Sequence, residues 1–192
     1  MSITIVAADA EHFTDVTTML GPKNPESTVC WCLAYRLDGR TNRELVGQAR
    51  CDYMRELCAA PRSPGVLAYD GDDVVGWAAV APRSETTFAR STKIPNVDDT
   101  PVWSAWCIKV RPGHRGKGIS HALLSGAVDW ARRQDAVAIE GYPVDNAGAR
   151  VNQTLAYVGT RKLFERAGFT KAADTTSVSD GFPRVVMRLD LR

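Results

Sequence analysis

The sequence lacks the features that mark membrane, secreted and nucleic-acid-binding proteins. Its 192 residues contain no run of about 18 apolar residues, so we expect no membrane-spanning helix. The net charge is only +2 and the basic residues are scattered, which argues against a nucleic-acid partner. Residues 1–6 carry no basic region and are typical of a strand rather than a signal peptide. We therefore expect a cytoplasmic protein with a single domain over residues 1–192.

Cysteine is present in an odd number and without a common metal-binding spacing. The five cysteines are Cys30, Cys32, Cys51, Cys58 and Cys107. An odd count without a signal peptide predicts reduced thiols. Zinc ligands usually come in pairs two to four residues apart at both ends of a site, which these cysteines do not match, so no metal is expected. Cys51 and Cys58 share one face of an expected helix, which indicates burial.

The most informative segment is a loop with three glycines that follows an apolar strand expected at residues 102–110. An amphipathic helix, expected at residues 117–133, begins in this loop. Glycines leave backbone N–H groups accessible to a ligand, and a helix N-terminus adds further N–H donors and a partial positive charge. Arg115 and Lys117 add full charges. The combination predicts a pyrophosphate site, the alternative being a loop that only turns the chain into the helix.

The spacing within this loop distinguishes between the known types of phosphate loop. A P-loop requires Lys and then Ser or Thr after the glycines, and here Ile119 follows Gly118. A dinucleotide fingerprint requires Gly or Ala where His121 stands. The pattern that fits is Arg/Gln-x-x-Gly-x-Gly/Ala, read as Arg115-Gly116-Lys117-Gly118-Ile119-Ser120. The loop therefore resembles the acetyl-CoA pyrophosphate loop of the GNAT N-acetyltransferase superfamily.

The expected order of elements resembles the GNAT fold over the whole chain. This resemblance implies an α/β (α+β) architecture, in which a mixed sheet of about seven strands is flanked by about four helices. The segment 163–169 is similar to the family's Leu-Tyr-Glu-Lys-x-Gly-Phe ending of the last helix, with Gly168 just past the helix end. A capping box at residues 41–44 is expected to open the second helix, which Pro61 ends. Strands are expected at 2–7, 66–69, 74–81, 102–110, 136–144, 169–176 and 184–190, and the other helices at 9–20, 117–133 and 156–167.

Four further segments resemble a bacterial branch of the superfamily. They are Cys-Trp-Cys at residues 30–32, Val-Gly-Trp at 75–77, Asp-Thr-Pro-Val-Trp at 99–103 and Glu-Gly-Tyr-Pro-Val-Asp at 140–145. In the GNAT fold, the loop that contains Cys30, Trp31, Cys32 and Tyr35 usually helps to form the acceptor pocket. An aromatic wall there suits a hydrophobic or aromatic amine, the alternative being that Trp31 fills the core under the loop.

The resemblance implies acetyl-CoA as co-substrate, bound where the fourth and fifth strands separate. Pro143 has no N–H to donate to a strand ladder, which weakens the pairing of the fifth strand, the alternative being that it only marks a sheet edge or a bulge. By motif alignment, the N–H of Ile108 polarises the thioester carbonyl and Val110 contacts pantetheine. The full set of cofactor-binding residues implied by the motifs is Ile108, Lys109, Val110, Arg115, Gly116, Lys117, Gly118, Ile119, Ser120 and Phe164.

The usual catalytic residues of the family are missing at two positions. Many relatives carry a glutamate base where this chain has Ser104, and a tyrosine where it has Phe164. Glu140, in an otherwise apolar strand, is the best remaining base, unless it is a paired structural carboxylate. Tyr157 or Tyr142 is the candidate acid for the CoA thiolate, the alternative being that both only pack.

Two further expectations follow for the reaction and its acceptor. Strict strand alternation places Cys107 on the face opposite Trp106 and Ile108, which argues against an acetyl-cysteine intermediate. The chain is expected to acetylate a primary amine of a small molecule by direct attack on the thioester, as a monomer or homodimer. A non-catalytic acyl-CoA-binding or regulatory GNAT-like domain is the alternative, supported by the residues at positions 104 and 164.

Overall fold

The chain folds around one seven-stranded sheet with the order β1-β2-β3-β4-β5-β7-β6. The computed structural model describes residues 2–24, 26–27, 31–152 and 156–192. β4 and β5 pair in parallel, and the other neighbouring strands are antiparallel. The strands are β1 (Ile3–Ala7), β2 (Gly65–Asp70), β3 (Asp73–Pro82), β4 (Trp103–Val110), β5 (Ala138–Gly141), β6 (Thr170–Ser179) and β7 (Phe182–Asp190). This architecture confirms the expected fold class.

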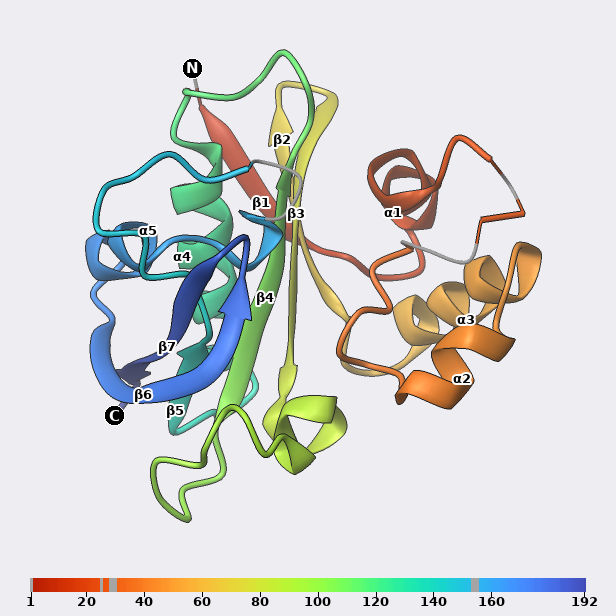
Figure 1. The fold of residues 1–192 in the computed structure, drawn as a ribbon. Helices are drawn as coiled ribbons and strands as arrows, with labels where there is room; N and C mark the ends of the chain where they lie inside the picture. The colour runs from red at the N-terminus through yellow and green to blue at the C-terminus, as the bar shows by residue number, and fades with distance from the viewer. Residues whose placement is uncertain (1, 25, 28–30, 153–155) are drawn as a thin grey trace.

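Helices cover both faces of the sheet (Figure 1). The helices are α1 (Phe13–Leu20), α2 (Gly39–Glu44), α3 (Gln48–Ala59), α4 (Ile119–Arg133) and α5 (Arg161–Arg166), with 3-10 turns η1 (Arg83–Glu85), η2 (Thr87–Arg90) and η3 (Ala156–Val158). Figure 1 shows α1, α2 and α3 on one side and α4 and α5 on the other. Trp77 and Trp106 belong to the core on the α1 side, and Leu123 and Phe164 belong to the core on the α4 side. Within the described ranges, no helix is long and apolar enough to span a membrane.

The N-terminal helices differ from the expectation in where they begin. α1 starts at Phe13 rather than Asp9, because the Asp9 carboxylate accepts the backbone N–H groups of Glu11 and His12 and holds them in a turn. The expected capping box at residues 41–44 is wrong. Asp38 caps α2 instead, accepting the N–H groups of Arg40 and Thr41, and the single expected helix is divided between α2 and α3. The positive φ of Gly47, 53°, lies at that division.

The last helix is shorter than expected, and its end has the predicted form. A 3-10 turn over η3 precedes α5, whose N-cap Thr160 accepts the N–H of Leu163. Gly168 has a φ of +88°, and the N–H of Phe169 donates to the carbonyl of Phe164 at 3.1 Å. These features form a Schellman motif, so the prediction that Gly168 lies just past the helix end is confirmed.

The sheet opens between β4 and β5, as the sequence predicts. Their pairing ends at Ala105 opposite Gly141, although β4 continues to Val110. Beyond β5 the chain bends away: the carbonyl of Pro143 accepts the N–H of Val185, and Val144 bridges to residues of two other segments. The second half of β4 therefore faces a gap in the ladder instead of a neighbouring β5 strand.

Candidate functional site

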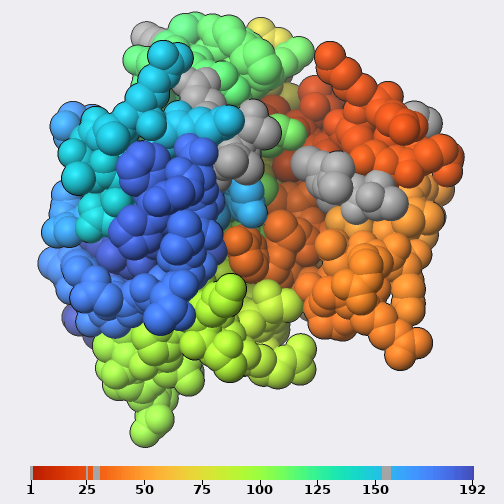
Figure 2. Space-filling model, in the orientation of Figure 1, coloured from red at the N-terminus to blue at the C-terminus, as the bar shows by residue number. Residues whose placement is uncertain are grey.

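The gap beside β4 opens into a cavity of about 1070 Å³. Figure 2 shows the surface hollowed between the N-terminal part of the chain, in orange, and its C-terminal end, in blue. Three parts of the chain form the wall: the segment from Cys32 to Arg50, the end of β4 with the loop after it, and the region of η3 and α5. The lining residues are Cys32, Ala34, Asn42, Arg50, Cys107, Ile108, Lys109, Val110, Pro112, His114, Arg115, Gly116, Gly118, Ile119, Ser120, His121, Tyr157, Thr160, Lys162, Leu163 and Arg166.

The glycine-rich loop has the backbone geometry of an anion cradle. Gly113, Gly116 and Gly118 have φ values of 86°, 78° and 78°, a region that favours glycine. A Cβ built on any of them would meet nothing within 4 Å, so the loop is open to a ligand. Gly118 is the N-cap of α4, so the backbone N–H groups of Ile119 and Ser120 have no acceptor within the helix. The loop fits a pyrophosphate on backbone geometry alone.

Most of the expected cofactor-binding residues lie in the cavity wall. These are Ile108, Lys109, Val110, Arg115, Gly116, Gly118, Ile119 and Ser120. Lys117 is exposed and is not one of the residues that line the cavity. Phe164 is also outside the wall. Its ring is fully buried, 5.1 Å between centroids from the ring of Phe169, and this packing does not support its expected contact with the cofactor.

Gly141 makes room for the Phe164 ring at the end of β5. A Cβ at Gly141 would lie 2.0 Å from Cε1 of Phe164, and all three nearest atoms belong to that ring. Phe164 therefore fills the core at the point where β5 stops pairing with β4. This packing gives Phe164 a structural role.

A β-bulge changes the expected orientation of Cys107. The register between β3 and β4 shifts between Trp77 and Ala79, and Cys107 has a φ of +52°. Trp106 and Cys107 consequently belong to the same core, on the α1 side, while Ile108 belongs to the other core. The expectation that Cys107 lies opposite Trp106 is therefore wrong, because the bulge interrupts the alternation.

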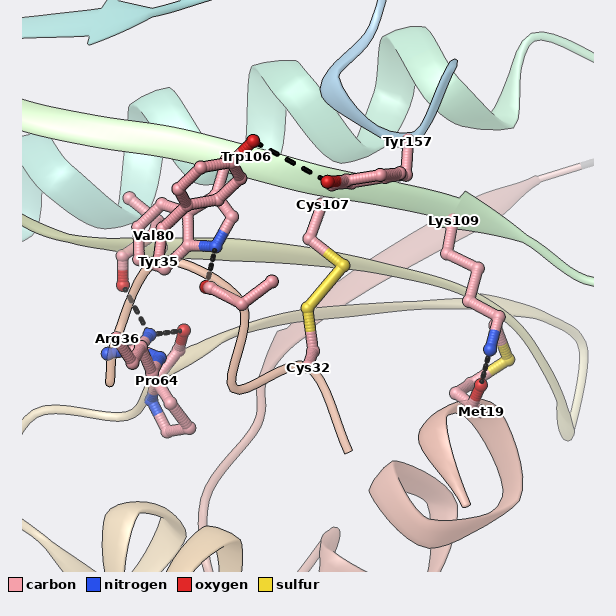
Figure 3. Close-up of a disulfide and its surroundings, with 11 residues drawn as sticks. Met19, Cys32, Tyr35, Arg36, Pro64, Val80, Trp106, Cys107, Lys109 and Tyr157 are labelled. Carbon is pink, nitrogen blue, oxygen red and sulfur yellow. Dashed lines mark hydrogen bonds between the residues drawn. A yellow bond between two sulfur atoms is a disulfide. The ribbon is translucent and has the colours of Figure 1, made fainter. Parts of the chain in front are cut away.

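Cys107 forms a disulfide with Cys32 (Figure 3). The expectation that all the cysteines are reduced thiols is wrong for this pair. Local sequence patterns could not reveal the pairing, because the two cysteines are 75 positions apart in the sequence. The bond joins the loop before α2 to the bulge of β4. The same loop is held by a second contact, in which the indole N–H of Trp106 donates to the carbonyl of Ala34 at 2.9 Å. Cys51 and Cys58 are buried thiols, as predicted.

Tyr157 is the one residue of the expected catalytic set that lines the cavity. Its hydroxyl lies 3.5 Å from the hydroxyl of Tyr35, which in turn accepts an N–H from Nη1 of Arg184 at 3.0 Å. Burial raises the pKa of Tyr157 to about 12, so the phenol keeps its proton at neutral pH. Either hydroxyl can be the donor in the contact between Tyr35 and Tyr157, and when Tyr35 donates, the Tyr157 proton is left for a group in the cavity.

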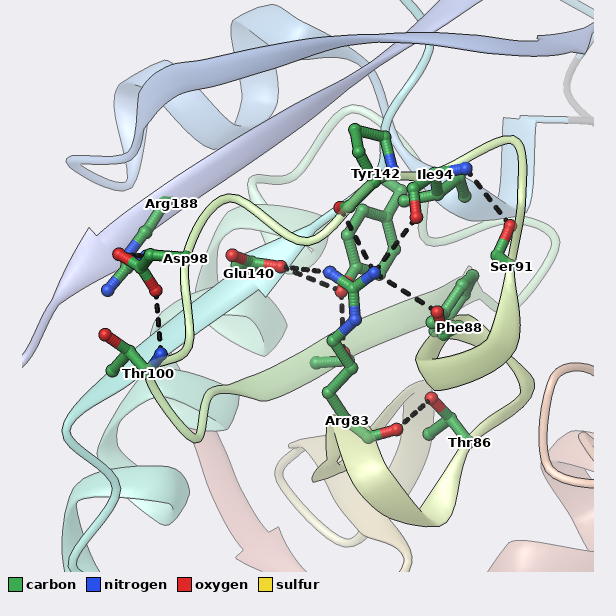
Figure 4. Close-up of polar contacts among 12 residues, drawn as sticks. Arg83, Thr86, Phe88, Ser91, Ile94, Asp98, Thr100, Glu140, Tyr142 and Arg188 are labelled. Atoms are coloured by element: carbon green, nitrogen blue, oxygen red, sulfur yellow. Dashed lines mark hydrogen bonds and ion pairs between the residues drawn. The ribbon is translucent and has the colours of Figure 1, made fainter.

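Glu140 and Tyr142 lie together outside this cavity (Figure 4). The Glu140 carboxylate accepts Nη1 of Arg83 at 2.8 Å and the hydroxyl of Tyr142 at 3.0 Å. Ser104 contacts the Tyr142 hydroxyl at 3.0 Å. All four side chains are buried. This network satisfies the carboxylate internally and does not support its expected role as base.

Arg83 connects the same network to the loop after β3. Its Nη2 donates to the carbonyls of Phe88, Ile94 and Pro95 at 3.0 to 3.1 Å. One guanidinium therefore holds the irregular segment 83–102 against β5. Burial raises the pKa of Tyr142, which stays a neutral donor to Glu140.

Sequence reasoning missed the residues that reach the site from distant segments. Arg184 on β7 and the Cys32–Cys107 bond have no local pattern that would reveal them, whereas Tyr35 was included in the acceptor loop without a specific role. Among the described residues, no group of three or more His, Cys, Asp or Glu side chains is arranged to hold a metal ion. Cys30 lies outside the described residues.

The site can be compared with known proteins. A model of the acetyltransferase (GNAT) family matches residues 31–169. Similar solved structures include yncA from Salmonella typhimurium with its cofactor acetyl-CoA, which is 18% identical with a TM-score of 0.54 over 100% of this chain and 95% of that one. A histone acetyltransferase HPA2 and related acetyltransferase from Corynebacterium glutamicum is 20% identical with a TM-score of 0.56, over 100% and 98%. Ard1 from Thermoplasma volcanium is 13% identical with a TM-score of 0.53, over 100% and 99%. No match was found among curated proteins.

Proposed function

Because the chain belongs to the acetyltransferase (GNAT) family, whose enzymes use acetyl-CoA as co-substrate, we propose that it acetylates the primary amine of a small molecule. The observation that carries this proposal is the continuity of one cavity from the glycine-rich loop to Tyr157 and the loop of Cys32. The first part fits the pyrophosphate of CoA, and the last part borders the segment expected to contact the acceptor. The amine then attacks the thioester directly.

The position of Ile108 supports the role expected for its backbone N–H, which is to polarise the thioester carbonyl. It lies on β4 beyond the last pair with β5, and it lines the cavity. Val110 lies further along the same strand, toward the loop, which is the order in which pantetheine and pyrophosphate follow one another in CoA. A preorganised backbone donor of this kind is often worth about 10²–10³ in rate.

Tyr157 donates the proton that the departing CoA thiolate takes up, and the proton that the attacking nitrogen loses as the amide forms restores the phenol. Its high pKa keeps it protonated, and the chain from Arg184 through Tyr35 places a positive charge at the far end. That charge stabilises the negative charge that develops on the phenol oxygen as the proton leaves. Tyr35 and Arg184 are therefore positioning residues for this step.

The acceptor enters the reaction as a neutral amine. No Asp or Glu belongs to the described part of the cavity wall, so that part of the wall offers no carboxylate base. An amine that loses its proton to water needs no side chain for that purpose. The rate at low acceptor concentration should consequently increase with pH up to the pKa of the acceptor itself.

Tyr157→Phe tests the assignment against Tyr142→Phe as a control. Loss of the acid should lower kcat by about 10²-fold while CoA affinity, measured by calorimetry, is unchanged. Tyr142→Phe should keep a near-normal kcat because Tyr142 does not line the cavity. Equal kcat in Tyr157→Phe and the wild type would contradict the role of Tyr157. CoA binding without turnover of any amine would favour the alternative of a non-catalytic CoA-binding domain.

A further inference from the structure

The Cys32–Cys107 disulfide lies in the wall of the cavity proposed to hold CoA. Both cysteines line it, and Cys107 directly precedes Ile108 in β4. Figure 3 shows the bond reaching from β4 to the loop before α2, near Tyr157. Because the bulge turns Cys107 toward the α1 side, Cys107 lies on the same side of the sheet as the loop of Cys32.

CoA carries a thiol at the end of its pantetheine arm, and the proposed reaction releases that thiol in this cavity. If the acetyl group is transferred beside Ile108, the product sulfur is left next to the residue that precedes Ile108 in sequence. A thiol held beside a disulfide exchanges with it through attack of the thiolate on one sulfur. The site therefore brings together the two reactants of a thiol–disulfide exchange.

We propose that Cys107 is a modification site at which free CoA forms a mixed disulfide. The inference rests on the proposed function, since it requires CoA to occupy the cavity. The CoA thiolate attacks Sγ of Cys107, a new S–S bond forms, and the Cys32–Cys107 bond breaks. Sγ of Cys32 leaves as a thiolate and takes up a proton. One thiol is consumed and one is formed, so no external oxidant or reductant is needed.

The exchange would link the acetylation site to the supply of its co-substrate. A CoA molecule joined to Cys107 occupies the cavity and excludes acetyl-CoA, so the enzyme stops. Breaking the Cys32–Cys107 bond also releases the loop of Cys32 from β4, whereas the hydrogen bond between Trp106 and Ala34 remains. A thiol reductant restores the free enzyme. Accumulated free CoA thus inhibits the oxidised enzyme covalently, and acetyl-CoA, which has no thiol, protects it.

The other described cysteines provide internal controls. Cys51 and Cys58 are buried on α3 and do not line the cavity. Burial raises the pKa of Cys58 to about 12, which keeps it a neutral and unreactive thiol. Modification confined to Cys107 would therefore reflect its position and not a general reactivity of the thiols.

Mass spectrometry of the full-length oxidised protein tests the proposal. The protein is incubated with CoA, with acetyl-CoA or with glutathione at equal concentration, and is analysed without reductant. We expect one CoA adduct, located at Cys107 by peptide mapping and removed by dithiothreitol. It should form at least about 10-fold faster than the glutathione adduct, because the cavity raises the local concentration of CoA. Acetyl-CoA should give no adduct and should slow the reaction with CoA.

Two variants and one binding measurement make the result decisive. Cys107→Ser should abolish the adduct, and Cys58→Ser should form it at the wild-type rate. The proposal is overturned if the disulfide does not form on oxidation, if the adduct lies on another cysteine, or if glutathione reacts as fast as CoA. Calorimetry on the same oxidised sample distinguishes a failure of the proposed exchange from a failure of the proposed CoA binding. CoA that binds without forming an adduct contradicts only this inference, whereas CoA that does not bind contradicts the proposed function.

Discussion

Replacing Glu140 with glutamine removes the negative charge of a buried ion pair and leaves almost everything else in place. The exposed fractions of the Arg83 and Glu140 side chains are 7% and 1%, so water cannot compensate the arginine that remains. Breaking a buried pair by removing one partner typically costs about 3–5 kcal/mol. The glutamine still offers an oxygen, and Arg83 keeps three carbonyl acceptors, which places the expected loss near the lower end, at about 3 kcal/mol.

The matched control is Glu85→Gln, which breaks an ion pair with Arg62 at the surface. In that pair the exposed fractions are 52% for Arg62 and 46% for Glu85, and pairs of this kind contribute about 0.2–1 kcal/mol. Urea denaturation followed by circular dichroism measures both variants against the wild type. We expect Glu140→Gln to lower the unfolding free energy several-fold more than Glu85→Gln, with an unchanged slope against urea concentration.

Activity measurements on Glu140→Gln separate a structural carboxylate from a catalytic base. The structure predicts a pH profile of kcat/KM with the wild-type shape, because Glu140 lies outside the cavity that is proposed to hold the reactants. A stability equal to the wild type, together with a loss of activity that high pH partly restores, would refute the reasoning. Glu140 would then be the base expected from the sequence.

Three further predictions concern stability. Reduction of the Cys32–Cys107 bond should lower the unfolding free energy by up to about 4 kcal/mol, since the bond closes a loop of 75 residues; equal urea midpoints with and without reductant would contradict this. Gly141→Ala should cost about 1–3 kcal/mol because its Cβ overlaps the Phe164 ring, and a wild-type melting temperature would show that the ring moves freely. The unfolding free energy should fall between about pH 9 and about pH 12, because burial raises the pKa of Cys58 from 9.0 to about 12. In that range the folded state keeps a proton that the unfolded state has lost. Cys58→Ser should flatten this decline in urea titrations.

Local patterns predicted the fold and the phosphate loop, because each depends on neighbouring residues. The positions of Gly116 and Gly118 before an amphipathic helix determine a backbone cradle by themselves, and the Schellman end of α5 depends on Gly168. The reactive part of the site depends on contacts between distant segments. Alternation along β4 failed at Cys107, since a bulge depends on the register with the neighbouring strand.

The partner of Glu140 was hidden for the same physical reason. Arg83 lies 57 residues earlier, and a carboxylate in an apolar strand is compatible with either a catalytic role or an ion pair until that partner is seen. Composition and motifs predict the phosphate loop, whereas the roles proposed for Glu140, Tyr142 and Tyr157 follow from whether each side chain lines the cavity. Only the packed structure supplies that information.

Acetyl-CoA binding to Ser120→Glu tests the central claim most directly. Ser120 lies in the first turn of α4 and lines the cavity, so the new carboxylate faces the expected pyrophosphate. A negative charge at a helix N-terminus favours the fold, which separates a loss of binding from a loss of structure. The control is Ser125→Glu, which carries the same charge on the same helix outside the cavity wall. Isothermal titration calorimetry should show acetyl-CoA affinity at least about 10-fold weaker for Ser120→Glu and unchanged for Ser125→Glu. Equal affinity in Ser120→Glu and the wild type would contradict the placement of CoA in this loop.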